Sequence, residues 1–141
     1  MVPLFDVWST NHQAGAGYVR ILASAYEVVV TNAPDSGFNP STGVFTAPQT
    51  GYYYFVAVGG FWVATGNFAG LDLTDSSWGT AESHSYPYTV SSGATSGSSG
   101  STSQADSLFK YMEANDTMCI WFRASTGFTN HFKAFQGFAL R

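Results

Sequence analysis

The segment Gly37–Phe55, GFNPSTGVFTAPQTGYYYF, decides the fold predicted for this chain of 141 residues. It contains the turn residues Asn39–Gly43, then a short apolar strand, then a corner between Pro48 and Gly51. The next residues, Tyr52–Val58, are apolar at every position. A strand alternates its side chains between two faces, so a strand with one wet face would alternate apolar and polar residues. We therefore expect both faces of this strand to be covered, one by a sandwich core and the other by a neighbouring subunit.

The remaining chain is also punctuated into short segments rich in aromatic and β-branched residues, which is typical of a sandwich or barrel. No stretch shows a sustained helical period. The strands expected besides Tyr52–Val58 are Phe5–Trp8, Val19–Leu22, Tyr26–Thr31, Gly43–Thr46, Phe68–Leu73, Tyr86–Val90, Ser107–Met112, Thr117–Arg123 and Phe132–Leu140. Gly59-Gly60 is expected to form a turn after the aromatic strand.

Three segments carry a family resemblance. The pattern Phe45–Pro48, FTAP, followed by Gly51 and Tyr53–Phe55, resembles the globular head domain of the C1q/TNF superfamily. The segment Asn115–Phe122 resembles the penultimate strand of that family, entered from an acidic turn. The segment Phe135–Leu140, FQGFAL, resembles its closing strand, which typically reads Phe-x-Gly-Phe-x-Leu.

The resemblance implies an all-β fold, a two-sheet antiparallel jelly-roll sandwich of about ten strands, with residues 1–141 as one C1q-like domain. It also implies a homotrimer in which the N-terminal and C-terminal strands lie side by side. Family heads of this kind are non-catalytic, and they bind protein or carbohydrate ligands outside the cell or at a cell or particle surface. The residues expected to form the core or the trimer contact are Tyr52, Tyr53, Tyr54, Phe55, Val56, Ile120, Phe122, Phe135, Gly137 and Phe138.

The segment Ser91–Ser103 is low in complexity, since twelve of its thirteen residues are Ser, Gly or Thr. It lies between strand-like segments, so we expect a flexible surface loop inside the domain rather than a linker between domains. A loop without a specific role and a loop that contacts a ligand are both compatible with this composition.

The low charge of the chain and the scattered positions of its basic residues exclude some classes of binding partner. Charged residues make up only 10% of the chain, against roughly 25% in an ordinary soluble domain. The net charge is −4, and the five basic residues are scattered, so no basic patch for nucleic acid is expected. The chain has no apolar run of ~18 residues, so we expect no membrane insertion. The single cysteine, Cys119, lies in an apolar run and is expected to be a buried hydrophobe.

No catalytic motif is present in the sequence: neither HExxH nor GxSxG occurs. No cofactor is expected, with calcium as the one candidate metal, because it prefers several hard oxygen ligands. Asp72 and Asp75 are the candidate calcium ligands. Trp78, Tyr86 and Tyr88 are candidate ligand-binding residues, because aromatic faces beside polar groups stack on sugars or anchor protein partners.

Two alternatives to a recognition module stay open at this point. The first is a purely structural trimer tip of a fibre or surface protein. The second is a jelly-roll carbohydrate-active enzyme, which would need a carboxylate pair or a metal triad converging in space. A separate feature is the triplet Asn115-Asp116-Thr117, which is an N-glycosylation sequon in an expected turn.

Overall fold

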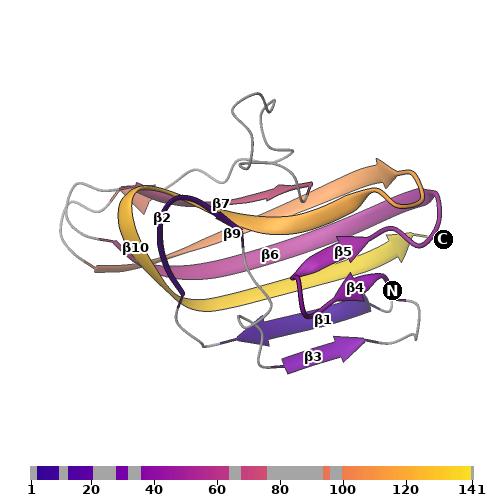
Figure 1. Cartoon of the computed structure of the whole chain (residues 1–141), viewed down its shortest axis with the longest axis horizontal. Coiled ribbons are helices and arrows are strands. Elements are labelled where there is room, and N and C mark those ends of the chain that lie inside the picture. The colour runs from indigo at the N-terminus through magenta and orange to yellow at the C-terminus, as the bar shows by residue number, and fades with distance from the viewer. Residues whose placement is uncertain are drawn as a thin grey trace.

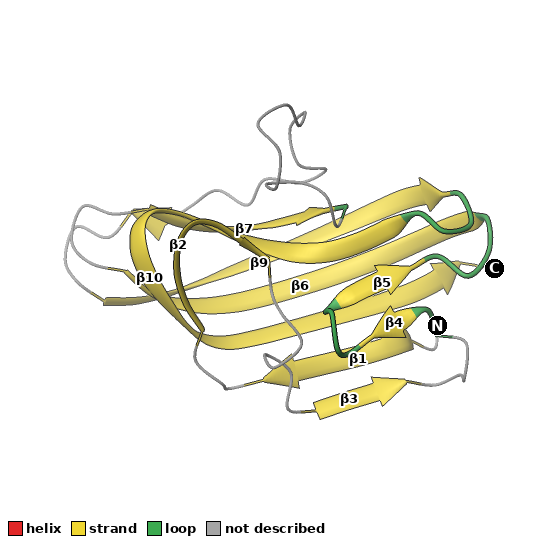
Figure 2. Ribbon diagram, in the orientation of Figure 1, coloured by secondary structure: helices red, strands yellow, loops and turns green. Residues whose placement is uncertain are grey.

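The computed structural model describes residues 3–9, 13–20, 28–31, 36–63, 68–75, 94–95 and 100–140, and these residues form strands and turns without a helix (Figure 2). The all-β jelly-roll sandwich predicted from the sequence is confirmed. The described strands are β1 (Pro3–Ser9), β2 (Gln13–Arg20), β3 (Val28–Thr31), β4 (Phe38–Asn39), β5 (Val44–Thr46), β6 (Gly51–Val63), β7 (Phe68–Thr74), β8 (Ala94–Thr95), β9 (Gly100–Met112) and β10 (Thr117–Leu140).

The longest strand, β10, belongs to both layers of the sandwich. Its residues 128–140 pair with β6, which in turn pairs with β9, and β1 and β3 continue this first layer on the other side of β10. Toward its start, β10 pairs with β5 through residues 117–118 and with β7 through residues 119–124. On the side away from β7, residues 121–124 and 128–130 of β10 pair with β2. Register shifts between Ala124 and Phe128 and between Asn130 and Phe132 mark where β10 curves from one layer to the other (Figure 1).

The two terminal strands lie side by side, as the resemblance implied. Val7 of β1 is opposite Phe135 of β10, and Asp6 is opposite Gln136, in an antiparallel register. The start of β1 and the end of β10 consequently lie at the same end of the molecule (Figure 1).

Several sequence-based expectations about strand limits are wrong. The strand expected at Val19–Leu22 begins at Gln13, as β2. The aromatic strand does not end at Gly59-Gly60, because both glycines pair with β9 and β6 continues to Val63. The expected loop Ser91–Ser103 is shorter, because Ala94–Thr95 form β8 and β9 begins at Gly100, while residues 91–93 and 96–99 lie outside the described residues. The penultimate and closing strands are continuous in β10. In each case a neighbouring strand supplies the hydrogen-bond partners that local propensity does not indicate.

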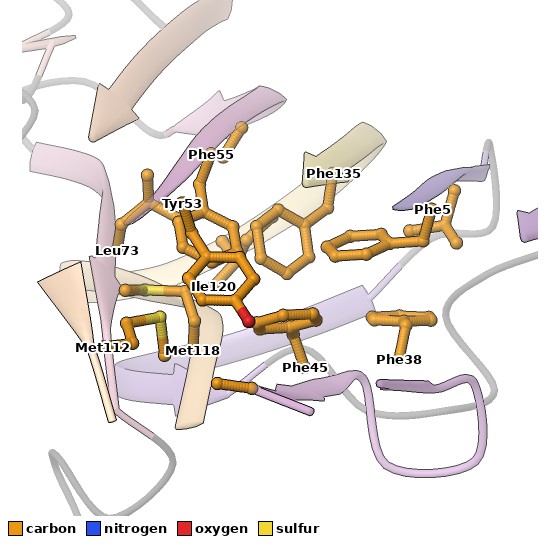
Figure 3. Packing of buried hydrophobic residues seen from close by; sticks show 13 residues of the cluster. Phe5, Phe38, Phe45, Tyr53, Phe55, Leu73, Met112, Met118, Ile120 and Phe135 are labelled. Carbon is orange, nitrogen blue, oxygen red and sulfur yellow. The ribbon is translucent and has the colours of Figure 1, made fainter. Parts of the chain in front are cut away.

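The core lies between the two layers and is largely aromatic (Figure 3). The Phe5 ring stacks on Phe38 with centroids 4.6 Å apart, and it meets Phe135 edge-on at 4.9 Å. Phe45 meets Tyr53 and Phe55 at 5.3 Å each. Offset and edge-to-face contacts of this kind add to the hydrophobic gain from burial, so this cluster is the main source of stability.

The segment Gly37–Phe55 contains the turns that its glycine and polar residues predict. Gly37 and Gly43 adopt φ angles of +79° and +71°, which L side chains rarely adopt. The amide of Thr46 donates to the Gly37 carbonyl at 2.8 Å, and Phe38 lies opposite Phe45, so the short strands β4 and β5 form a hairpin that covers the core. This hairpin is the reason Phe38 and Phe45 reach the same cluster as Phe5.

Candidate functional site

The candidate site is the outer face of the sheet β3-β1-β10-β6-β9, which is the face directed away from the core. Tyr53 and Phe55 of β6 point inward and are fully buried. The residues that alternate with them point outward, and Tyr52 keeps 50% of its surface exposed. Tyr54 and Val56, on the same outer side, are half-buried. The period of two along β6 therefore separates one aromatic run into a core row and a surface row.

An outer aromatic cluster forms where β6 meets its two neighbours; its members are Tyr52, Tyr54, Phe109, Tyr111 and Phe138. The rings of Tyr52 and Phe109 are stacked, with centroids 5.2 Å apart and planes at 14°. Tyr52 also meets Tyr111 edge-on at 5.2 Å, and Tyr54 contacts Phe138 at 6.2 Å. Phe109 and Tyr111 are 58% and 52% exposed, which is unusual for large side chains grouped together on one face.

The outer face changes in character along the strands. Beyond the aromatic cluster, Val58 lies opposite Ala105, and Gly60 lies opposite Ser103. Small side chains therefore separate the large rings from Trp62, the next large ring on the outward row of β6. Among the described side chains of this face, Asp6 is the charged one, and it lies opposite Gln136. Removing water from a face with so few charged groups costs little desolvation free energy.

Solved structures with a similar arrangement identify the architecture. The globular domain of zebrafish complement 1qA protein has a TM-score of 0.66 and 18% identity, with 99% of this chain and 98% of that chain covered. This is the C1q/TNF fold. Murine APRIL has a TM-score of 0.62 and 13% identity, over 96% of this chain and 97% of that chain. Eiger TNF from S. frugiperda has a TM-score of 0.52 and 13% identity, over 99% and 96%. No family model and no curated protein sequence matches the chain.

The resemblance motifs occupy defined places in this C1q/TNF fold. Ile120 and Phe135 lie in the core, fully buried. Gly137 lies against the ring of Phe5, with no room for a side chain. Phe138 belongs to the outer aromatic cluster. Phe122 lies in β10, and its side chain is outside the described residues.

The structure does not test the candidate metal ligands as a pair. Asp72 lies in β7 opposite Trp121, and its side chain is outside the described part. The main-chain carbonyl of Asp75 accepts hydrogen bonds from the Trp121 indole, at 3.2 Å, and from the buried Cys119 thiol, at 3.6 Å. Within the described residues no group of three His, Cys, Asp or Glu could hold a metal ion. Calcium binding by this pair stays a prediction.

The candidate ligand-binding residues Trp78, Tyr86 and Tyr88 lie outside the described residues. Trp62 is 46% exposed, because it follows Tyr52 and Tyr54 on the outward row of β6. Sequence reasoning missed Phe109 and Tyr111. Their signal was the alternation in Ser107–Met112, SLFKYM, where the two rings share one face.

Proposed function

We propose that the chain is a non-catalytic recognition module that acts as a homotrimer outside the cell or at a cell or particle surface. The outer aromatic cluster is the observation that carries this proposal, and we assign it to the contact between subunits. The trimer would then present protein-binding or carbohydrate-binding sites three times, so that weak individual sites gain avidity. The C1q/TNF fold and the low charge of the chain support the same reading.

The energetic argument rests on the half-exposed rings. Fully burying a Phe-sized side chain contributes about 1.5–3 kcal/mol, so covering the remaining half of one ring contributes about 1 kcal/mol. Tyr52, Phe109 and Tyr111 each have roughly half of their surface to cover. Neighbouring rings that already contact one another lose little side-chain freedom on association, because their positions are fixed in the free subunit.

The alternative of a purely structural trimer tip shares the same subunit contact and differs only in lacking a ligand. A glycan array and a search for protein ligands would separate the two. A carbohydrate-active enzyme would need convergent carboxylates or a metal triad, and the described residues provide no observation that favours one.

The test is the mass of the chain in solution, measured by light scattering, for the wild type and for Phe109→Asp. We expect the wild type at about three times 15.1 kDa. Phe109 is 58% exposed in the single chain, so an aspartate there is compatible with folding. In the trimer each contact would bury an unpaired carboxylate, at a cost of several kcal/mol. Every 1.4 kcal/mol is tenfold in affinity, so the variant should dissociate.

The matched control is Ser41→Asp, which adds the same charge in an exposed turn outside the outer face. It should keep the mass of the wild type. A wild-type monomer would remove the proposal. A trimeric and folded Phe109→Asp protein would show that the outer aromatic cluster is not the contact.

A further inference from the structure

The turn Glu113–Asp116 joins β9 to β10 and contains the only sequon of the chain, Asn115-Asp116-Thr117. All four turn residues are exposed. Because β9 belongs to the first layer and Thr117 pairs with Thr46 of β5, the turn crosses the end of the sandwich and does not lie on the outer face (Figure 1).

The main chain of this turn is held without any help from the Asn115 side chain. The Glu113 amide donates to the Asp116 carboxylate at 2.9 Å, and the Ala114 amide donates to the Thr50 hydroxyl at 3.1 Å. The Asn115 amide donates to the Ala47 carbonyl at 2.9 Å, and the Asp116 amide to the Glu113 carbonyl at 3.0 Å. Every amide of the turn is therefore satisfied.

The side-chain amide of Asn115 makes no hydrogen bond with the residues that the structure describes. Its φ angle of +77° favours asparagine or glycine, and glycine would satisfy the backbone equally well. The contrast is Asn39, whose side-chain oxygen accepts from the Ser41 amide at 2.8 Å and is engaged in its own turn. Asn39 is followed by Pro40, which excludes it as a sequon.

We propose that Asn115 is a site of N-linked glycosylation. In this reaction a bond forms between Nδ2 of Asn115 and the anomeric carbon of an oligosaccharide carried on a polyprenyl diphosphate. The bond between that carbon and the diphosphate oxygen breaks, and its electron pair leaves with the lipid diphosphate. One amide proton is released, and no oxidation or reduction takes place. Thr117 supplies the hydroxyl that the sequon requires.

The placement also makes a glycan compatible with self-association. The sugar would extend from the end of the molecule, beside the corner that contains Thr50, while the outer aromatic cluster stays uncovered. This inference rests on the extracellular setting of the proposed function, and it is independent of the subunit contact.

The experiment is expression of the full chain behind a cleavable secretory leader in eukaryotic cells, with intact mass measured before and after peptide N-glycosidase. We expect one glycan on the wild type and none on Asn115→Gly, a change that suits the positive φ and keeps the fold. The variant Pro40→Ala removes the proline that blocks Asn39, so that Asn39 and Ser41 complete a second sequon in another exposed turn. This variant should gain a second glycan.

A lumenal wild-type chain without a glycan would overturn the inference. If Pro40→Ala carries a glycan while the wild type carries none, the chain reaches the oligosaccharyltransferase but Asn115 is not glycosylated. If neither is modified, the inference is equally wrong. Light scattering on the same samples reports self-association separately, so a glycosylated monomer would refute the proposed function and leave the glycosylation site standing.

Discussion

Gly137 is the position in β10 where one added carbon should have the largest effect. A Cβ at this residue would overlap the ring of Phe5, with Cζ at 2.7 Å and Cδ1 at 3.1 Å, both tighter than ordinary van der Waals contact. The backbone of Gly137 is not in the positive-φ region, so alanine itself suits the strand. The Gly137→Ala variant therefore isolates overpacking from backbone strain.

The magnitude follows from how firmly the Phe5 ring is held. It is fully buried, stacked on Phe38 at 4.6 Å and packed edge-on against Phe135 at 4.9 Å, so it has no open space to move into. Overpacking a core costs about 1–3 kcal/mol. Replacing glycine by alanine in a strand returns about 0.5–1 kcal/mol of backbone entropy. Because the ring has no space to move into, the overpacking cost should lie at the upper end of its range, so the net loss of unfolding free energy should be about 2 kcal/mol. This lowers Tm by roughly 4–8 °C in a chain of this size.

Thermal and denaturant unfolding of four proteins would measure this effect: wild type, Gly137→Ala, Phe5→Leu and the double variant. The smaller leucine makes room for the new methyl group, so the double variant should be more stable than the sum of the single losses predicts. The coupling between residues in contact is expected at about 0.5–3 kcal/mol. A Gly137→Ala protein as stable as the wild type, or strictly additive losses, would refute the packing described between β1 and β10.

The remaining predictions concern pH, metal and core size. Burial raises the pKa of Tyr53 above its ordinary value of 10.0, and its hydroxyl donates to the Gln49 carbonyl at 2.6 Å. The unfolded chain then releases this proton first, so stability should fall as the pH rises above about 10, and Tyr53→Phe should remove that part of the fall. Calcium titration calorimetry should give heat that Asp72→Asn with Asp75→Asn abolishes, and no heat at millimolar calcium would remove the metal prediction. Phe45→Ala should cost about 3–5 kcal/mol in denaturant unfolding, because it leaves a cavity in the aromatic core, and a loss under 1 kcal/mol would contradict the burial of this ring.

The sequence predicted the structure best where the local turn and strand preferences of a segment agree with its packing in the fold. The glycines and turn residues of Gly37–Phe55 specify a hairpin and a corner, and alternation along β6 specifies which rings point inward. Strand lengths were less predictable. Gly100–Ser103 has the composition of a loop, yet it lies in β9 because Gly60 to Val63 of β6 pair with it. Pairing of this kind comes from the partner strand and not from the segment itself, so no local pattern reveals it.

In the trimer that we propose, strand β9 would favour association through the outer face over growth of the sheet. In the described residues β9 pairs with β6 alone, so its other side would otherwise be a template for a further strand. Its inward row includes Gln104, Asp106 and Lys110, and one oxygen of the Asp106 carboxylate is buried and has no hydrogen-bond partner in the part of the chain that the structure describes. A strand added at this edge would bury such polar groups further, which costs free energy. The outward row of the same strand carries Phe109 and Tyr111, whose burial contributes free energy. The two rows of β9 thus oppose pairing at the edge and favour packing on the face, and in the proposed trimer they would direct a second copy of the chain toward the outer aromatic cluster.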